Sequence, residues 1–299
     1  MSLVLSLIAA EAKAPLGAKD IDDARRVLEA AGAAPGAPAW LAAGIACDIP
    51  FSGNAAAGRD AVRQALSSRS IDVNVVPTEN RRKRLLLADM DSTMIEQECI
   101  DELAAELGLR DKVAAITERA MRGEIEFAPA LRERVALLRG LPIAAVDKVL
   151  QAGISIMPGA RTLVATMHRA GAHTTLVSGG FTAFVEPVAR RIGFDETRAN
   201  VLIAEGATFS GSVAEPILGA DAKEAALTEL TARLRLAAAA TLAVGDGAND
   251  AGMVRRAGLG VAYRAKPALR AVAAATIDHS DLTGLLYLQG FSREEFVEA

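Results

Sequence analysis

The sequence has only two cysteines, Cys47 and Cys99, among its 299 residues. Two cysteines are too few for a disulfide framework, and their separation does not match a metal-binding cysteine motif. The three histidines show no metal-binding spacing either. We therefore expect a protein of the reducing cytoplasm that does not use cysteine or histidine to bind a metal.

The sequence also lacks a long apolar run and a low-complexity tail. No stretch approaches the roughly 20 apolar residues that are needed to span a bilayer. The short apolar run Leu3–Ala10 has no Lys or Arg before it, and Glu11 follows it directly. These flanks favour an N-terminal strand over a signal peptide and argue against a membrane partner.

An excess of positive charge is absent as well, because the formal net charge is -4 and the pI is about 5.6. Nucleic acids and anionic membrane surfaces bind clustered positive charge, so neither is an expected partner. A small anionic substrate, in contrast, needs only a local basic pocket. The contents of 51% hydrophobic and 23% charged residues are ordinary for a soluble globular protein, and the length leaves room for two domains.

Residues 1–77 are predicted to form a small α+β domain. The expected elements are a strand at 2–10, a helix at 19–31, strand material at 38–50, a helix at 55–66 and a strand at 71–76. In the last of these, apolar and polar residues alternate, which is typical of a half-buried strand. The order β-α-β-β-α-β predicts a split βαβ sandwich that can fold by itself.

Residues 78–84 separate this domain from the rest of the chain and contain the basic cluster Arg81-Arg82-Lys83-Arg84. Such a cluster is consistent with a phosphate or nucleic-acid patch, or with a solvated linker between two domains. We favour the solvated linker, because a short charge run is usually exposed to water.

Residues 85–299 are predicted to form the larger domain. Directly after its first strand, at about 95–153, four short segments carry apolar residues at helical spacing and are separated by glycine or proline. We interpret this insert as a helical cap. Beyond it, strands alternate with helices and residues 200–217 read as a hairpin, so we expect an α/β fold with a doubly wound, Rossmann-like parallel sheet.

Polar side chains follow three of the expected strands of this sheet. They are Asp89 and Asp91 after the first strand, Ser178 and Gly179 after the second, and Asp246, Asn249 and Asp250 after the third. The carboxyl ends of parallel strands lie at the same edge of a sheet, so these groups are expected to converge. Four acids at one edge repel each other unless a hard cation with oxygen ligands neutralises them, and Mg²⁺ is the natural candidate.

Groups suited to an oxyanion accompany these acids. Ser178 supplies a hydroxyl, Gly179 and Gly180 allow close approach of backbone N–H groups at the start of a helix, and Lys223 supplies a compact positive charge. Acids, a metal and an anion cradle together indicate phosphoryl transfer. A carboxylate can attack phosphorus to give an aspartyl-phosphate, and a second acid can protonate the leaving alkoxide and later deprotonate water.

Four segments in order resemble the motifs of the haloacid dehalogenase superfamily and, more narrowly, those of its phosphoserine phosphatase family. The segments are Asp89-Met90-Asp91-Ser92-Thr93, Val177-Ser178-Gly179-Gly180-Phe181-Thr182, Lys223 and Val244-Gly245-Asp246-Gly247-Ala248-Asn249-Asp250. An Asp-x-Asp pair by itself is a weak signal, since it also occurs in the metal sites of glycosyltransferases and in plain turns. The four motifs in this order are specific, and the resemblance runs from about residue 84 to the C-terminus.

The resemblance implies that Asp89 is the nucleophile and Asp91 the general acid/base. It also implies that the Asp89 carboxylate, the Asp91 backbone carbonyl and Asp246 bind Mg²⁺, with Asp250 close to the metal. The implied reaction is hydrolysis of O-phospho-L-serine to serine and phosphate, the last step of serine biosynthesis.

The resemblance further assigns the groups that bind the substrate. Ser178, Gly179 and Lys223 would bind the phosphoryl group, and Asn249 would order that side of the site. In the cap, Glu98 would bind the substrate ammonium, Arg134 would bind its carboxylate, and Met121 and Phe127 would cover the ligand. Opposite charges on one cap fit a zwitterionic amino-acid phosphate, which favours phosphoserine over a generic phosphate ester.

The N-terminal domain resembles the amino-acid-binding ACT type that precedes the phosphatase in bacterial relatives. The loop Glu11–Lys19, however, lacks a clear ligand-binding signature. We therefore favour dimerisation or packing over serine binding, and a homodimer is possible.

Three other functions are considered beside phosphoserine hydrolysis. A related phosphatase for phosphohomoserine or phosphothreonine would share every core motif and differ in the fit of its cap. A dehalogenase would use one aspartate without Mg²⁺, and the second acid Asp91 argues against it. A non-enzymatic amino-acid sensor built on the N-terminal domain is disfavoured by the full set of catalytic motifs.

Overall fold

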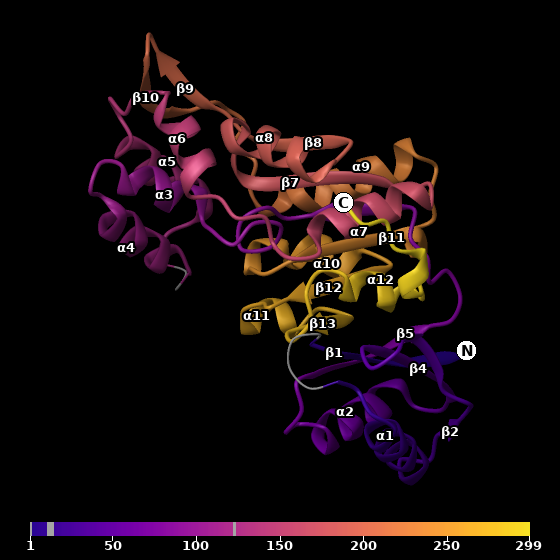
Figure 1. The fold of residues 1–299 in the computed structure, drawn as a ribbon. Helices are drawn as coiled ribbons and strands as arrows, with labels where there is room; N and C mark the ends of the chain where they lie inside the picture. Colours follow the sequence, from indigo (N-terminus) through magenta and orange to yellow (C-terminus); the bar gives the residue numbers. More distant parts are fainter. Residues whose placement is uncertain (1, 11–14, 122–123) are drawn as a thin grey trace.

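The computed structural model describes residues 2–10, 15–121 and 124–299. Of Met121 it describes the backbone alone. The N-terminal domain lies against one edge of a larger α/β domain, and the helical insert lies at the opposite end (Figure 1). No helix within the described residues is long and apolar enough to cross a membrane.

The N-terminal domain is a five-stranded antiparallel sheet with two helices. Its elements are β1 (Leu3–Ala9), α1 (Ala18–Ala30), β2 (Ala34–Pro35), β3 (Ala39–Ala42), β4 (Ala46–Ser52), α2 (Ala55–Ala65) and β5 (Ile71–Pro77). The strand order is β2-β4-β1-β5, and β3 also pairs with β4. The short strand β2 is the only described element of this domain that the sequence pattern did not indicate, because two residues carry no periodic signal.

The core domain is built on a six-stranded parallel sheet. Its strands are β6 (Leu85–Ala88), β7 (His173–Phe181), β8 (Glu196–Asn200), β11 (Thr241–Gly245), β12 (Leu259–Tyr263) and β13 (Ala275–Ile277), in the order β13-β12-β11-β6-β7-β8. The doubly wound sheet that the sequence predicts is therefore confirmed. The edge strand β8 was not anticipated, because its polar sequence gives no apolar run and the strand is only half-buried.

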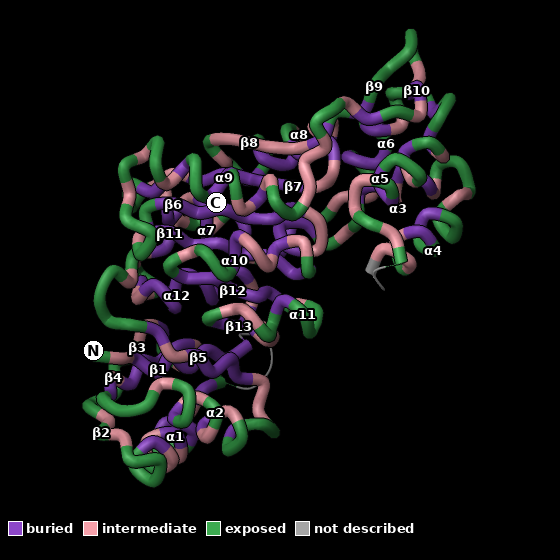
Figure 2. The backbone as a smooth tube through the Cα atoms, turned by 180° about the vertical axis from the view of Figure 1, so that it is seen from behind, coloured by how far each residue is buried: buried purple, intermediate pink, exposed green. Residues whose placement is uncertain are grey.

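Helices cover both faces of this sheet. They are α7 (Ala160–Arg169), α8 (Thr182–Ile192), α9 (Ala220–Arg233), α10 (Ala251–Arg256), α11 (Pro267–Arg270) and α12 (Gly284–Leu288). Side chains of a strand alternate between faces, so Leu86 and Ala88 of β6 pack with α7, α8 and α12, whereas Leu85 and Leu87 pack with α9 and α10. This explains the unbroken apolar run of β6, and Figure 2 shows the central strands β11 and β12 buried beside the half-buried edge strand β8.

The insert after β6 forms a cap together with the hairpin. The cap helices are α3 (Cys99–Ala105), α4 (Arg110–Met121), α5 (Phe127–Ala136) and α6 (Ala145–Ala152), and the hairpin strands are β9 (Leu202–Glu205) and β10 (Thr208–Val213). Backbone hydrogen bonds join the loop before α6 to β10: the Gly140 N–H donates to the Phe209 carbonyl, and the Phe209 N–H donates to the Leu141 carbonyl. The hairpin is thus an extension of the cap (Figure 1).

Strand β5 connects the two domains, because its polar side chains bind the edge strand β13. The Asn74 side chain donates to the Thr276 carbonyl (2.8 Å) and accepts from the Thr276 N–H (2.9 Å). The Asp72 carboxylate accepts backbone N–H groups of residues 278–280. The expectation that β5 is half-buried was wrong: both of its faces are buried, since its polar face covers a sheet edge that would otherwise be exposed.

The basic segment before β6 also contributes to this interface. Arg81 pairs with Asp48 of β4 and donates to the carbonyls of Leu288 and Tyr287. Lys83 is buried and its ammonium donates to the Ala239 carbonyl. The expectation of a solvated linker was therefore wrong for these two residues, because the packed domains supply acceptors that a sequence pattern cannot show.

We expect Asn74→Ala to lower the free energy of unfolding by about 2–4 kcal/mol, because it leaves the N–H and carbonyl of Thr276 buried without partners. Urea denaturation followed by circular dichroism measures the effect. The control is Gln64→Ala on the exposed face of α2. A loss for Asn74→Ala no larger than that of the control would contradict the assignment of Asn74 as a domain-docking residue.

Candidate active site

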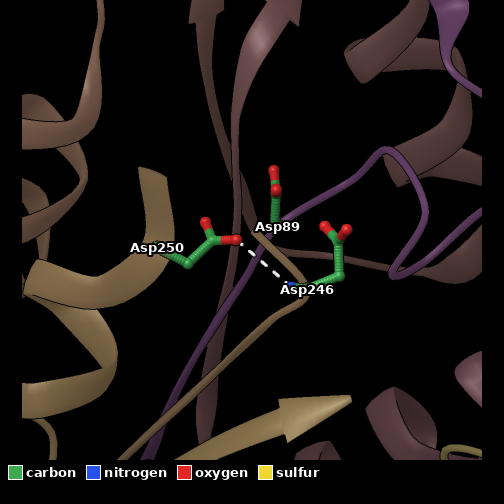
Figure 3. Close-up of side chains that lie close together, drawn as sticks. All are labelled: Asp89, Asp246 and Asp250. Atoms are coloured by element: carbon green, nitrogen blue, oxygen red, sulfur yellow. Dashed lines mark hydrogen bonds between the residues drawn. The ribbon is translucent and has the colours of Figure 1, made fainter. Parts of the chain in front are cut away.

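The polar groups that follow the central strands converge at one edge of the sheet. Asp89 follows β6 directly, Asp246 follows β11, and Asp250 ends the single turn Ala248–Asp250. Ligand atoms of these three acids lie within 4.8 Å of one another (Figure 3). Each acid is placed by a strand end or by the turn beyond it, so the sheet fixes their separation.

A buried lysine lies between two of these acids. The Lys223 ammonium is 2.7 Å from Asp89 Oδ1 and 2.6 Å from Asp250 Oδ1, and its side chain is 1% exposed. Although burial alone lowers the pKa of Lys223, the two carboxylates raise it above its ordinary value. The lysine therefore stays charged. It lies in the first turn of α9.

Asp250 is held by hydrogen bonds to both of its oxygens. Oδ1 accepts from Lys223, and Oδ2 accepts from the backbone N–H groups of Asp246 and Gly247 (3.2 and 3.1 Å). A Cβ at Gly245 would lie 2.4 Å from this carboxylate, so only glycine fits at the end of β11. This explains the glycine that precedes the acid in the third motif.

One lysine does not balance the three acids. Burial, and then Asp250, raise the pKa of Asp246 to about 6, and the same two causes raise the pKa of Asp89. Three carboxylates facing one space are a suitable oxygen donor set for a hard divalent cation, which would remove this repulsion. The three residues therefore fit the predicted magnesium site.

Asp91 lies on the cap side of Asp89. Its Oδ1 accepts the backbone N–H of Cys99 at the start of α3 (3.4 Å). Burial, and then Glu98, raise the pKa of Asp91 to about 7. Asp91 differs from Asp89 in making no ion pair with Lys223 within 4.0 Å among the described residues, so its carboxyl is available for proton transfer.

The last residues of β7 present the predicted anion-binding groups, so the strand continues past the point at which the sequence pattern ends it. The Ser178 hydroxyl oxygen accepts the Gly180 N–H (2.8 Å), and the Asn200 amide donates to the Gly179 carbonyl (2.8 Å). The Asn200 side chain also bonds to both backbone groups of Leu218, just before α9. Sequence reasoning missed Asn200, because it ends a strand that has no apolar signal.

A cavity of about 660 Å³ connects this edge of the sheet with the cap. Its lining includes Asp89, Asp91, Glu98, Phe127, Arg134, Ser178, Gly179, Asp246 and Asn249 from the sequence prediction, and Thr117 and Lys266, which were not predicted. Lys223 and Asp250 lie beneath the cavity surface and are not part of the lining. The side chain of Met121 lies outside the described structure.

The cap wall carries opposite charges and an aromatic ring. Arg134 is half-buried and is oriented by Thr117, whose hydroxyl accepts from it at 3.3 Å. Glu98 is exposed and accepts the Ser92 hydroxyl at 2.7 Å. The Phe127 ring approaches the core so closely that a Cβ at Gly179 or Gly219 would lie 3.0 or 3.2 Å from it. These glycines let the cap ring lie over the anion-binding loop.

Comparison with known proteins matches this architecture to one family. The sequence model of the haloacid dehalogenase-like hydrolase family matches residues 86–255. The phosphoserine phosphatase SerB2 of Mycobacterium tuberculosis is 44% identical over 219 residues, which are 73% of this chain and 53% of that protein, so the chain spans about half of its length. The phosphoserine phosphatase of Archaeoglobus fulgidus is 41% identical over 234 residues, 78% of this chain and 68% of that protein.

Solved structures agree with the sequence comparison. A probable phosphoserine phosphatase from Vibrio cholerae superposes with a TM-score of 0.78 at 28% identity and covers 98% of this chain and 88% of that one. A substrate-bound phosphoserine phosphatase has a TM-score of 0.65 at 37% identity, over 69% of this chain and 98% of that one. The family match and the shared fold show that this chain belongs to the haloacid dehalogenase-like hydrolase family of enzymes.

Proposed function

We propose that the protein is a Mg²⁺-dependent phosphatase that hydrolyses O-phospho-L-serine to serine and phosphate. One observation carries the proposal: one cavity joins Asp89, which pairs with the buried Lys223, to Glu98 and Arg134 on the cap wall. The first pair suits phosphoryl transfer, and the second suits a ligand with an ammonium and a carboxylate. Relatives named phosphoserine phosphatase, at 41–45% identity, support it.

Asp89 is the proposed nucleophile. The Lys223 ammonium at 2.7 Å favours its ionised form, and the Met90 N–H at 2.8 Å fixes the same oxygen. The other carboxylate oxygen attacks phosphorus, the bond to the seryl oxygen breaks, and an aspartyl-phosphate forms. Covalent catalysis of this kind divides one difficult transfer into two easier steps.

Asp91 is the proposed general acid and base. A carboxyl whose pKa is raised to about 7 carries a proton in part of the molecules at neutral pH and can return to the carboxylate afterwards. It gives its proton to the leaving seryl oxygen. It then takes a proton from water, whose oxygen attacks phosphorus and releases Asp89 and phosphate.

The C-terminal end of β7 is proposed to bind the phosphoryl oxygens. Ser178 is held by the Gly180 N–H, and the Gly179 peptide is held by Asn200, so these donors keep their positions during the reaction. Asn249 also lines the cavity and is proposed to order the part of the site beside Asp246. Lys223 acts on the phosphoryl group through Asp89, because its ammonium lies below the cavity surface.

The cap is proposed to select the substrate. Glu98 binds the ammonium, Arg134 binds the carboxylate in a bidentate pair, and Phe127 excludes water from the reacting group. Met121, assigned to the same role by resemblance, stays a prediction, as do a homodimer and a cytoplasmic location.

Asp89 and Asp246 would bind Mg²⁺, with the Asp91 backbone carbonyl and with Asp250 close by. When bound, the metal supplies positive charge that stabilises the transferring phosphoryl group.

The first test is phosphate release from phosphoserine by the wild type and by Asp89→Asn. We expect the variant to lose at least about a thousandfold in kcat, because an amide cannot attack phosphorus. The matched control is Asp221→Asn in the exposed first turn of α9. Substantial turnover by Asp89→Asn would contradict the nucleophile, and a wild type that prefers phosphothreonine or phosphohomoserine would contradict the substrate.

The second test concerns the metal. Mg²⁺ at about 100 times its Kd is expected to stabilise the wild type by about 2.7 kcal/mol, and Asp246→Asn is expected to lose most of this gain. Thermal unfolding with and without Mg²⁺ measures it, with Asp221→Asn again as the control. Because removing one of three facing acids also removes repulsion, metal-free Asp246→Asn should unfold at or above the temperature of the metal-free wild type. An undiminished Mg²⁺ effect in this variant would exclude Asp246 as a ligand.

The third test separates substrate selection from chemistry. For Arg134→Ala we expect KM for phosphoserine to rise by roughly 10- to 100-fold, the size of a lost charge-assisted pair, and KM for an aryl phosphate to change little. Arg132→Ala is a matched control two residues away, since Arg132 pairs with Glu215 on the exposed side. Equal effects on the two substrates would refute the role of Arg134 as the carboxylate ligand.

A further inference from the structure

Two positive side chains lie among the described residues that line the cavity, Arg134 and Lys266. Lys223 is the lysine that the sequence motifs assign to the phosphoryl group, but it is sealed beneath the surface by Asp89 and Asp250. Under the proposed function, Arg134 binds the substrate carboxylate. Lys266 is therefore the remaining described cation that can meet the phosphoryl group from the cavity side.

The backbone of Lys266 is fixed to the catalytic edge of the sheet. Its N–H donates to the carbonyl of Asp246 (2.9 Å), and its own carbonyl accepts the N–H groups of Leu269 and Arg270. Pro267, the next residue, restricts the backbone further, and it also lines the cavity. The side chain of Lys266 thus starts from a rigid point beside the proposed metal ligand Asp246.

The ammonium of Lys266 is loosely held. It lies 3.9 Å from Asp246 Oδ2, its side chain is 50% exposed, and the structure gives it no hydrogen-bond partner among the described residues. A lysine on a flexible four-carbon stem can move from this position to an incoming anion. This contrasts with Lys223, which has two short contacts and cannot move without unpairing two buried acids.

The negative charge of the cavity lining favours a role for Lys266 in binding an anionic substrate. Its described lining carries the acids Asp89, Asp91, Glu98 and Asp246, and a phosphate ester dianion must approach them. A mobile cation at the rim lowers this electrostatic barrier and offers three donors to the phosphoryl oxygens.

We propose that Lys266 is a substrate-binding residue that leaves Asp246 and binds the phosphoryl group of the incoming substrate. This inference rests on the proposed function for the identity of the substrate. It differs from a purely structural role, in which Lys266 would only offset the charge of Asp246.

The test compares the Mg²⁺-loaded wild type with Lys266→Gln and Lys266→Arg. Steady-state kinetics on phosphoserine give KM and kcat, and titration calorimetry gives the Kd of inorganic phosphate. We expect Lys266→Gln to raise both KM and the Kd of phosphate by roughly tenfold, as for one lost hydrogen bond to a charged group, with kcat within about twofold. Lys266→Arg should retain most of the affinity.

The matched control is Lys148→Gln, which removes an exposed lysine of the cap that pairs with Glu106. The salt dependence gives a second readout: raising the ionic strength should weaken phosphate binding more in the wild type than in Lys266→Gln, because the lost contact is electrostatic.

The inference is overturned if KM and the Kd of phosphate in Lys266→Gln stay within twofold of the wild type. It is also overturned if the only change is a lower Mg²⁺ requirement, which is the result that a structural partner of Asp246 would give. If the wild type releases no phosphate from phosphoserine, the proposed function fails, and the phosphate titration still decides the role of Lys266.

Discussion

The site depends on one buried cation, the ammonium of Lys223 between Asp89 and Asp250. An unpaired ammonium or carboxylate in this position would be costly, so the three groups are stable only together. This requirement sets the local geometry: Asp250 must lie against the end of β11, Gly245 must lack a side chain, and α9 must bring its first turn to the sheet edge. The lysine opposes the rise in the Asp89 pKa that burial and Asp250 cause, but its single charge leaves the three acids short of two positive charges, which makes the edge receptive to a divalent metal.

The core domain and the cap contribute different groups to the site. Strand ends of the core present the groups that we propose to act on phosphorus, and rigid strands hold such groups precisely. The cap presents Glu98, Arg134 and Phe127, on helices that follow β6 in the chain. The close approach of Phe127 to Gly179 and Gly219 brings the cap into contact with the core beside the proposed catalytic groups.

The N-terminal domain is attached by specific polar contacts as well as by apolar packing. The side chains of Asn74 and Asp72 form hydrogen bonds with backbone groups in and just after the edge strand β13. Arg81 bonds to Asp48 of β4 and to the Tyr287 carbonyl near the end of α12. Edge strands expose unpaired backbone groups, and side chains of β5 supply the partners that another strand would supply. Helix α11 begins at Pro267 in the cavity lining and is followed in the chain by β13, so it connects the wall of the cavity to the edge strand that the N-terminal domain covers.

The sequence by itself predicted most of the elements and the chemistry that we propose for the site. The run Leu85–Ala88 predicted a strand buried on both faces, the helical spacing of 95–153 predicted a cap, and the acids after β6 and β11 predicted a metal and phosphoryl site. These features can be recognised from the sequence, because each depends on the pattern of residues that are neighbours in the chain. The tertiary structure alone decided which lysine faces the cavity, why Asn200 matters, and why Asp72, Asn74, Arg81 and Lys83 are buried. Each of these depends on a partner far away in the chain, and no periodic pattern records how distant elements pack.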